Sequence, residues 1–244
     1  MALLTLENVS KIYSIEGLPV MALDSVTLSI EYGSFVSVIG KSGAGKTTLL
    51  RIINQLEKPD KGTISYDRSV KTGTIFQEPR LIRTKTVEKN LQLALCREKN
   101  REEVKNLIDE TLRMTGLTLF RKAYPFQLSG GMAQRVSLGR ALCRKPELLL
   151  MDEPFGALDA ITRKNLQGEL RTIFRSSNIT IIFITHDVTE AIMLSERILV
   201  MNNGQITDDI KVTLPKDRNE NDKDFIELKK HLYESIILKE NKIP

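Results

Sequence analysis

The sequence predicts an α/β protein with a mixed, largely parallel sheet flanked by helices, an antiparallel β subdomain and an inserted helical subdomain. From Leu148 onward, continuously apolar strand segments alternate with helical segments, a pattern typical of a parallel sheet covered on both faces. Residues 86–142 show a helical pattern without a convincing strand, which indicates the insertion. A short apolar segment at 35–39 runs straight into a glycine-rich loop.

The N-terminal part is expected to hold short strands and one helix. Residues 4–9 and 26–30 alternate apolar and polar side chains, as half-buried strands do, and Gly17–Pro19 between them is typical of a turn. The apolar run at 35–39 predicts a buried strand. The other elements expected before the insertion are a helix at 46–56 and strands near 63–66 and 74–76.

After the insertion, which Pro146 closes, strands and helices alternate. The elements expected there are strands at 148–151, 180–184 and 198–201 and helices at 160–174 and 188–194. Asn202–Gly204 predicts a hairpin turn into a last short strand. We therefore expect residues 1–215 to form one domain, with a helical subdomain at about 78–145.

Residues 216–244 predict a linker and a C-terminal amphipathic helix. The composition turns charged and polar from Lys216 to Asp224. After this linker, one apolar stripe has helical spacing, formed by Phe225, Leu228, Leu232 and Ile236. Such a helix either regulates or docks a partner, or packs on its own domain. Packing on its own domain is the favoured interpretation.

Composition argues against nucleic acid as a partner. The net charge of +5 comes from 36 basic and 31 acidic residues whose signs are interspersed, which favours an ordinary solvated surface. Aromatic residues make up 5% of the chain and Trp is absent, which disfavours a surface that stacks bases. A hydrophobic content of 41% is enough for a real core.

The remaining global features predict a protein of the cytosol. Cys96 and Cys143 form no metal-ligand pattern, and such sparse cysteine use fits a reducing compartment. Cys143 lies in an apolar helical segment, where a buried thiol is the default. No run of about 18 apolar residues is present, and the N-terminus lacks the basic leader of a signal peptide. A role at a membrane therefore requires a partner.

A glycine-rich loop follows the strand at 35–39 and predicts a phosphate site. It matches the P-loop pattern in full with Gly40, Lys41, Ser42, Gly43, Ala44, Gly45, Lys46 and Thr47. Its glycines let backbone N–H groups point inward, and the following helix adds its positive N-terminal end. Lys46 would contact the β- and γ-phosphates, and the Thr47 hydroxyl would bind Mg²⁺. The sequence thus predicts a P-loop NTPase fold that binds a nucleotide.

Two adjacent carboxylates end the predicted strand at 148–151. Asp152 and Glu153 follow a hydrophobic strand, whose C-terminal edge lies beside the P-loop in such sheets. Asp152 would hold the Mg²⁺ shell, and Glu153 would accept a proton from the attacking water. A strand ending in Asp-Glu is usually just solvated, but the full P-loop upstream favours the catalytic interpretation.

A third motif, Leu128–Arg135, resembles a motif of a known protein family. It begins Leu-Ser-Gly-Gly and opens a helix, which suggests a second phosphate site. It resembles the signature motif of ATP-binding cassette (ABC) proteins. The resemblance implies that Ser129, Gly130 and Gly131 close over the γ-phosphate held by a second subunit, so that the protein hydrolyses ATP as a dimer.

Other positions match the same family in order along the chain. The resemblance implies that Gln77 contacts Mg²⁺ and senses the membrane partner, that Asp159 communicates across the dimer, and that His186 positions the γ-phosphate and water. It also implies that Tyr13 stacks on the adenine. In isolation, Gln77 would be read as a surface residue, His186 as structural and Tyr13 as ordinary packing. Gly139 replaces the usual Ala inside the signature helix, at about 1 kcal/mol of helix propensity.

The site residues that follow from the motifs and the resemblance fall into three groups. The residues expected to bind ATP are Tyr13, Gly40, Lys41, Ser42, Gly43, Ala44, Gly45, Lys46, Thr47, Thr48, Gln77, Ser129, Gly130, Gly131 and Asp159. Those expected at Mg²⁺ are Thr47, Gln77 and Asp152, and those expected to be catalytic are Lys46, Glu153 and His186.

A narrower resemblance points to importers. The segments 75–81 and 151–163 and the Leu214-Pro215 tail look like the nitrate/sulfonate/taurine importer ATPases. The segment 83–86 departs from that subfamily, which usually has Pro-Trp-Leu-Thr there. This segment lies near the surface expected to grip the membrane subunit, so the partner and the solute could differ.

The resemblance as a whole implies the ATPase subunit of an ABC importer. Its expected cofactors are ATP and Mg²⁺. Its expected partners are a second copy or paired cassette on ATP binding, integral-membrane permease subunits and, indirectly, an extracytoplasmic solute-binding protein, with no nucleic acid. The chain would sit in the cytoplasm, peripheral on the inner face of the cell membrane. The alternatives are a non-transport cassette protein acting on nucleic acid or ribosomes, a transport ATPase for another solute or for export, and a nucleotide-binding module without turnover.

Overall fold

A computed structural model of the chain describes residues 1–96, 98 and 100–238. It divides into two compact units, each taken by itself below. The first unit comprises residues 1–69 and 180 onward, and the second unit comprises residues 70–179. The sequence predicted other limits, one domain at 1–215 with a helical subdomain at 78–145. These domain limits stay a prediction.

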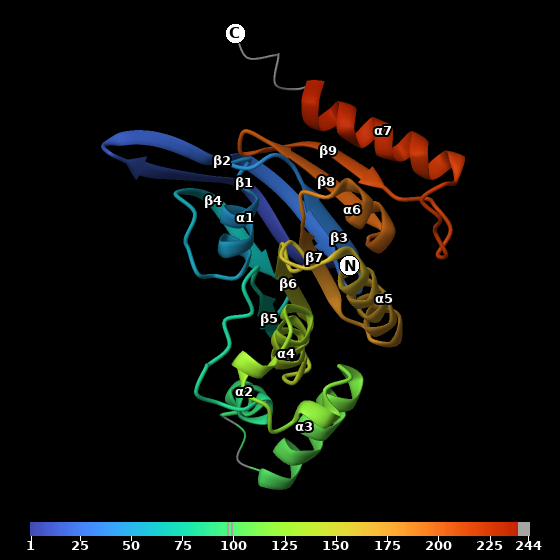
Figure 1. The fold of residues 1–244 in the computed structure, drawn as a ribbon. Helices are drawn as coiled ribbons and strands as arrows, with labels where there is room; N and C mark the ends of the chain where they lie inside the picture. Colours follow the sequence, from blue (N-terminus) through green and yellow to red (C-terminus); the bar gives the residue numbers. More distant parts are fainter. Residues whose placement is uncertain (97, 99, 239–244) are drawn as a thin grey trace. The chain divides into compact units, whose positions relative to one another are not determined.

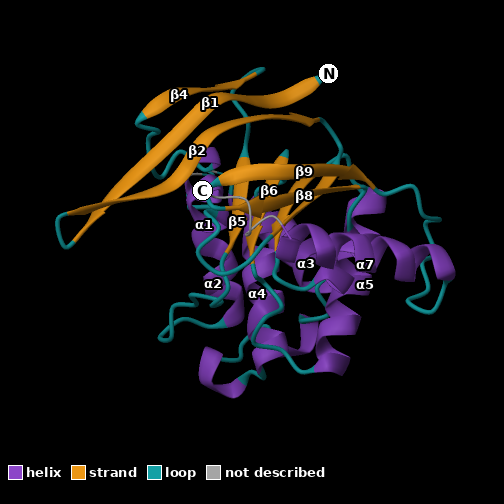
Figure 2. Cartoon of the chain, turned by 90° about the horizontal axis from the view of Figure 1, so that it is seen from above, coloured by secondary structure: helices purple, strands orange, loops and turns teal. Residues whose placement is uncertain are grey.

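The first unit contains an antiparallel sheet with the strand order β2-β1-β4. Its strands are β1 (Ala2–Ile15), β2 (Leu18–Glu31) and β4 (Lys61–Tyr66). The pairing of β1 with β4 runs only from Leu4 to Ser10, whereas the pairing with β2 continues to Ile15. The β1–β2 hairpin therefore extends beyond β4 (Figure 2).

The same unit holds the strands that carry the glycine-rich loop. β3 (Phe35–Ile39) lies between β7 (Thr180–Ile184) and β8 (Arg197–Asn202) and is parallel to both. β9 (Gln205–Lys211) adds to β8 in the antiparallel sense. Every residue of β3 and β7 is buried, as expected for strands covered on both faces.

Among the described residues of the first unit, the helices are α1 (Lys46–Ile53), α6 (Val188–Leu194) and α7 (Lys223–Leu238). Phe225 and Leu232 of α7 are buried in one cluster with apolar residues of α6 and β8. Figure 1 shows α7 in red. Burying each such side chain stabilises by roughly 2 kcal/mol. The favoured interpretation, a C-terminal helix packed on its own domain, is confirmed. Residues 239–244 of the predicted segment lie outside the described residues.

The second unit contains two parallel strands, β5 (Thr72–Ile75) and β6 (Leu148–Asp152). Its α-helices are α2 (Val87–Ala94), α3 (Arg101–Met114), α4 (Gly130–Leu142) and α5 (Ala160–Ser176), with short 3₁₀ helices η1 (Thr118–Phe120) and η2 (Pro125–Gln127). The residues at 97 and 99 of the predicted insertion lie outside the described residues.

Helices α2, α3 and α4 share an apolar core that includes Leu91, Leu112 and the buried Cys143. Gly139 of α4 permits this packing, because a Cβ atom there would lie 2.9 Å from Thr111 Cγ2 and 3.2 Å from Leu91 Cδ2. The glycine thus has a packing role that its lower helix propensity did not indicate. The predicted burial of the Cys143 thiol is confirmed.

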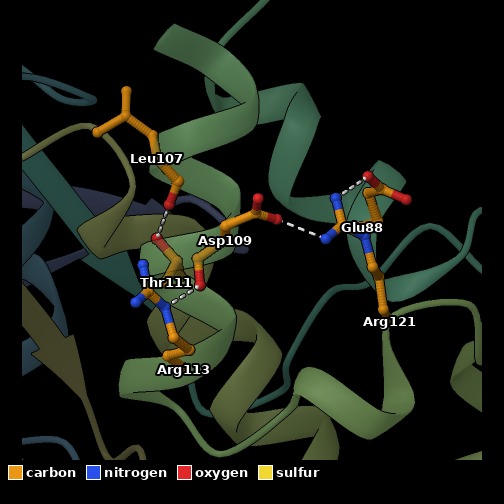
Figure 3. Close-up of polar contacts among 6 residues, drawn as sticks. All are labelled: Glu88, Leu107, Asp109, Thr111, Arg113 and Arg121. Atoms are coloured by element: carbon orange, nitrogen blue, oxygen red, sulfur yellow. Dashed lines mark hydrogen bonds and ion pairs between the residues drawn. The ribbon is translucent and has the colours of Figure 1, made fainter. Parts of the chain in front are cut away.

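Arg121 links the first turn of α2 to the middle of α3. Its guanidinium donates to Asp109 Oδ1 and to Glu88 Oε1, each at 2.5 Å (Figure 3). The hydrogen bonds to Glu88 and Asp109 raise the pKa of Arg121. Two carboxylates held by one guanidinium fix the two helices more firmly than an isolated surface pair would.

The predicted fold class, a P-loop α/β protein with a largely parallel sheet, an antiparallel sheet and helices, is confirmed. Several element limits needed correction. β1 and β2 extend over residues 2–15 and 18–31, beyond the predicted 4–9 and 26–30. The turn predicted at Gly17–Pro19 lies at Glu16–Gly17. Both of these residues have positive φ, as a two-residue hairpin turn requires, and β2 begins directly after them at Leu18. The helix predicted at 46–56 ends at Ile53, and Gln55 has φ 57°.

Across the described residues we find no helix with the length and apolarity that a membrane crossing requires.

Candidate nucleotide site

The glycine-rich loop joins β3 to α1 in the first unit, and two backbone hydrogen bonds hold it. Ala44 N donates to Lys41 O at 3.2 Å, and Gly204 N donates to Ala44 O at 3.1 Å. The second bond ties the loop to the β8–β9 turn. The predicted phosphate loop is therefore a braced structure, with Lys41, Ser42 and Gly43 exposed.

Two glycines give the loop its shape for different reasons. Gly45 has φ +97°, and a Cβ atom there would lie 2.2 Å from the Ala22 carbonyl oxygen. Gly43 has φ +81°, yet no described atom lies within 4 Å of its Cβ position. The backbone needs glycine at both positions, but only Gly45 also fills a close approach between two chain segments.

Lys46 is buried and its ammonium lies inside the loop. Nζ donates to the carbonyl oxygens of Gly40 and Lys41, at 2.8 Å each. Lys46 and the exposed Thr47 begin α1, and among the described residues no side chain caps that helix. Side chains cap α2, α4, α5 and α6. The first N–H groups of α1 thus suit an anionic group.

His186 follows β7, the strand next to β3. Because β3 and β7 are parallel and Val38 pairs with Ile184, both strands end at the same edge of the sheet. Gly40 and His186 each come directly beyond that edge, and His186 is exposed. The structure thus puts His186 on the same edge of the sheet as the loop, and its role at the γ-phosphate stays a prediction.

Tyr13 lies on β1 and contacts residues around α1. Its hydroxyl donates to Glu57 Oε2, and Lys11 Nζ lies 5.8 Å from the centre of its ring. Burial raises the pKa of Tyr13, the Glu57 carboxylate raises it further, and a hydrogen bond from Thr48 opposes them. The hydroxyl is thereby anchored beside α1, and the half-buried ring remains partly exposed for an aromatic base.

In the second unit, Gln77 and the two carboxylates lie at one strand edge. β5 and β6 are parallel, with Ile75 paired to Met151, so Gln77 and Asp152 both lie at their C-terminal ends. Gly156 lies between the side chains of interest. A Cβ atom on it would be 3.7 Å from Gln77 Nε2 and 4.0 Å from Glu153 Oε2. The structure therefore brings Gln77 and Glu153 to the same glycine.

The backbone of Glu153 is unusual. Its φ is +43°, in the left-handed region that few residues other than glycine adopt. β6 ends at Asp152, so this turn directs Glu153 away from the strand. Strained conformations of this kind persist where the surrounding structure holds them, and they gather at functional sites.

The signature motif begins α4. Ser129 is the N-cap, and its Oγ accepts a hydrogen bond from Met132 N at 3.2 Å. A Cβ atom on Gly131 would lie 2.3 Å from Thr162 Cγ2, and one on Gly130 would lie 3.8 Å from Leu158 Cδ2. Gly131 therefore lies against the first turn of α5, and Gly130 lies beside Leu158 just before that helix.

Asp159 caps that first turn of α5. Its Oδ1 accepts hydrogen bonds from Ile161 N and Thr162 N at 3.2 and 3.0 Å. The Thr162 hydroxyl and these amides lower the pKa of Asp159. The structure thus brings the Ser129–Gly131 motif and the Asp159 turn together within the second unit.

Comparison with known proteins decides the family. Residues 23–156 match the profile of the family described as ABC transporter. The chain belongs to the ABC transporter family. Both the resemblance stated from the motifs and the prediction of an ABC-type ATPase are confirmed.

Two curated relatives in this ABC family are similar over nearly the whole chain. The aliphatic sulfonates import ATP-binding protein SsuB of Bacillus cereus is 43% identical, covering 93% of this chain and 92% of the relative. An uncharacterized ABC transporter ATP-binding protein of Methanocaldococcus jannaschii is 41% identical, covering 94% and 89%. The nitrate import ATP-binding protein NrtC of Synechococcus elongatus is 40% identical over 88% of this chain, which spans 35% of that longer protein.

Among solved ABC structures, the chain is similar to the dimeric, post-hydrolysis state of the cassette MJ0796 bound to ADP and Pi. The sequences are 32% identical, the TM-score is 0.78, and the match covers 87% of this chain and all of that one. This likeness supports ATP as the nucleotide and a dimer as the working assembly of the ABC cassette.

Some residues of this ABC cassette site were not identified from its sequence. Glu57 anchors Tyr13, Gly156 lies beside Gln77 Nε2 and Glu153 Oε2, and Thr162 contacts Gly131. Each acts through a contact between distant segments, so local spacing carries no signal for it. Gly156 lies within the segment 151–163 of the subfamily resemblance, but nothing in that pattern indicates this contact.

Proposed function

We propose that this chain is the ATP-hydrolysing subunit of an ABC importer, in which two copies or a paired cassette bind ATP and drive a separate permease. The observation that carries this proposal is the 43% identity to an import ATP-binding protein over 93% of the chain, with all three motifs in place. ATP fits the braced loop of the first unit, whose glycines, buried lysine and uncapped helix start suit phosphate oxygens.

Each site residue has a proposed role. Lys46 contacts the β- and γ-phosphates, and the backbone from Gly40 to Thr48 surrounds them. Tyr13 stacks on the adenine, and His186 orients the γ-phosphate and water. Glu153 is the general base that accepts the proton of the attacking water. The left-handed backbone of Glu153 and its approach to Gln77 at Gly156 support this assignment.

Magnesium is the metal that this donor set suits. Thr47, Gln77 and Asp152 offer only oxygen atoms as ligands, which Mg²⁺ prefers, and the exposed Thr47 hydroxyl begins α1. When bound, Mg²⁺ neutralises charge on the phosphates. Asp152 ends β6 and Gln77 follows the neighbouring strand β5, so both side chains come from one strand edge.

Dimer formation completes the proposed mechanism. Ser129, Gly130 and Gly131 of one copy face the γ-phosphate that the other copy holds, and the Asp159 turn packed against them joins the same interface. ATP therefore holds the copies together, and hydrolysis releases them. Closing and opening of the pair would alternate the access of the permease.

The solute and the partners follow the relatives. Names of sulfonate and nitrate import proteins favour small anionic solutes of the nitrate, sulfonate and taurine type. They do not favour a cassette protein acting on nucleic acid or ribosomes. The further partners proposed are permease subunits and, indirectly, an extracytoplasmic solute-binding protein, with the chain on the cytoplasmic face of the membrane.

The test is affinity capture of the tagged chain from detergent-solubilised native membranes, with mass spectrometry and an ATPase assay on the eluate. A chain with Lys46→Ala serves as the matched control for activity. Recovery of a multi-helix permease with ATPase activity that the control lacks is expected. Recovery of ribosomes or DNA-repair proteins without any membrane subunit would exclude the importer role.

A further inference from the structure

The β1–β2 hairpin carries an exposed apolar surface beyond Tyr13. Ile15 pairs with Leu18 and Tyr13 pairs with Val20, so these side chains share one face of the hairpin. Leu18 is 69% exposed, Ile15 57% and Val20 41%. We call Ile15, Leu18 and Val20 the apolar tip. It lies past the last residue of β1 that pairs with β4 (Figure 2).

A second exposed apolar surface precedes the signature motif. Tyr124 and Phe126 stack with ring centres 5.8 Å apart and planes at 17°. Phe126 is 82% exposed in a chain with only eight Phe and five Tyr. We call these two residues the aromatic pair. Apolar side chains grouped on a surface in this way mark contact sites.

The aromatic pair is held in place rather than loosely placed. Pro125 begins η2 with a fixed φ, Gln127 N donates to Tyr124 O at 2.9 Å, and Tyr124 N donates to Gln127 Oε1 at 2.8 Å. Phe126 is thus presented in one orientation. A preorganised aromatic loses little conformational entropy when it is covered.

Both surfaces lie close along the chain to residues that are proposed to contact ATP. Phe126 lies three residues before Ser129, within about 10 Å along the chain. Ile15 lies two residues beyond Tyr13, about 7 Å along an extended strand. In the proposed dimer, Ser129 of one copy faces the ATP that lies on Tyr13 of the other. The aromatic pair and the apolar tip then flank one ATP from its two sides.

We propose that, in the ATP-held dimer, the aromatic pair of one copy packs against the apolar tip of the second copy. The inference rests on the proposed function, because the dimer brings the two surfaces together. A two-fold axis repeats the contact at both ATP sites. The contact shields the base end of each ATP from water and adds apolar area to an interface otherwise built on phosphate contacts.

Cross-linking tests the contact directly. The background is the full chain with Cys96→Ser, which removes the exposed thiol and keeps the buried Cys143, and with Glu153→Gln, which holds ATP unhydrolysed. Into it we place Leu18→Cys with Phe126→Cys. The matched control is Ser14→Cys with Phe126→Cys, because Ser14 lies on the opposite face of the same hairpin. Each pair is treated with a short bismaleimide with and without MgATP.

The expected result is a covalent dimer that needs MgATP and forms at least about ten times more with Leu18→Cys than with Ser14→Cys. Size-exclusion chromatography of the same samples reports dimerisation independently. A dimer that forms with MgATP while the two pairs cross-link equally poorly would overturn the contact and leave the proposed function intact. If MgATP produces no dimer at all, both the contact and the dimeric mechanism fail.

A second measurement does not depend on cysteines. Phe126→Ser should weaken ATP-dependent dimerisation about tenfold, whereas Phe126→Leu, which keeps an apolar side chain, should retain most of it. Adding Leu18→Ser to Phe126→Ser should weaken dimerisation little further, because both substitutions remove the same contact. Equal dimerisation by Phe126→Ser and the unmodified chain would contradict the proposal. ATP affinity of the separate copies should stay within twofold in every variant.

Discussion

Gly131 has no room for a side chain because Thr162 lies against it, 2.3 Å from the Cβ position to Thr162 Cγ2. Rotation of Thr162 would remove the clash, but its hydroxyl is engaged with Asp159. The glycine of the signature motif thus serves the packing of α4 on α5 as well as the proposed approach to ATP.

Gly131→Ala should lower the free energy of unfolding by about 2 kcal/mol, because it overpacks this contact. Adding Thr162→Ser removes Cγ2, keeps the hydroxyl for Asp159, and should restore most of the loss. Urea unfolding measures both. ATPase activity should stay low in the double variant, since the added methyl still faces the proposed ATP contact. A double variant as unstable as Gly131→Ala would refute the packing argument.

Two substitutions in the phosphate loop separate backbone strain from close approach. Gly43→Ala should lower the free energy of unfolding by about 1 kcal/mol, because only the positive φ disfavours alanine at this position. Gly45→Ala should cost about 3 kcal/mol, because its Cβ would also meet the Ala22 carbonyl. Urea unfolding without nucleotide makes the comparison. Equal costs would show that the Ala22 contact relaxes easily.

Asn90 is fully buried and holds the loop that follows Gln77. Its Oδ1 accepts from Ile82 N at 2.8 Å, and its Nδ2 donates to Lys85 O and Thr86 O at 3.0 Å each. Asn90→Ala should lower the free energy of unfolding by about 3 kcal/mol, because it removes the hydrogen bonds that this buried side chain makes to the loop backbone. The exposed neighbour variant Lys89→Ala should stay within about 0.5 kcal/mol. Similar losses of stability in Asn90→Ala and Lys89→Ala would show that the Asn90 side chain does not hold the loop.

How much of this could be read from the sequence depends on the range of each interaction. The phosphate loop, Asp152-Glu153 and the signature motif are local patterns, and the structure places them at strand ends and helix starts as predicted. The strands of the hairpin proved longer than predicted. Their outer parts contain exposed residues that do not alternate simply, so the periodicity ended early.

The rest comes from contacts between distant segments. Gly139 looked like a small loss of helix propensity, but it makes room for Thr111 and Leu91. Gly156 lies beside Gln77 and Glu153, and Glu57 anchors Tyr13 across the first unit. None of these roles leaves a trace in spacing or composition.

Asp60 should make stability depend on pH at the base of the hairpin. Its carboxylate accepts from Ile12 N at 2.7 Å and Lys11 Nζ at 3.0 Å, and these bonds lower its pKa, the Ile12 bond most. Because the pKa of Asp60 is lower in the folded state, its carboxylate stabilises the fold at pH values above the ordinary pKa of about 4. This stabilisation is lost as the pH falls through the folded pKa.

Asp60→Asn should therefore flatten the fall of Tm below about pH 4. Lys11→Met should flatten it less, because the Ile12 amide remains. Thermal unfolding from pH 7 down to pH 2 records both curves. A wild-type curve that coincides in slope with that of Asp60→Asn would mean that this carboxylate does not contribute.

The proposed mechanism of this ABC cassette depends on Glu153 as the general base of ATP hydrolysis. The most direct measurement is MgATP turnover of the full chain beside Glu153→Gln, with the exposed Glu196→Gln as matched control. We predict that Glu153→Gln lowers turnover at least about 100-fold while ATP binding is kept, and that Glu196→Gln matches the wild type. Turnover by Glu153→Gln at the wild-type rate would contradict the account.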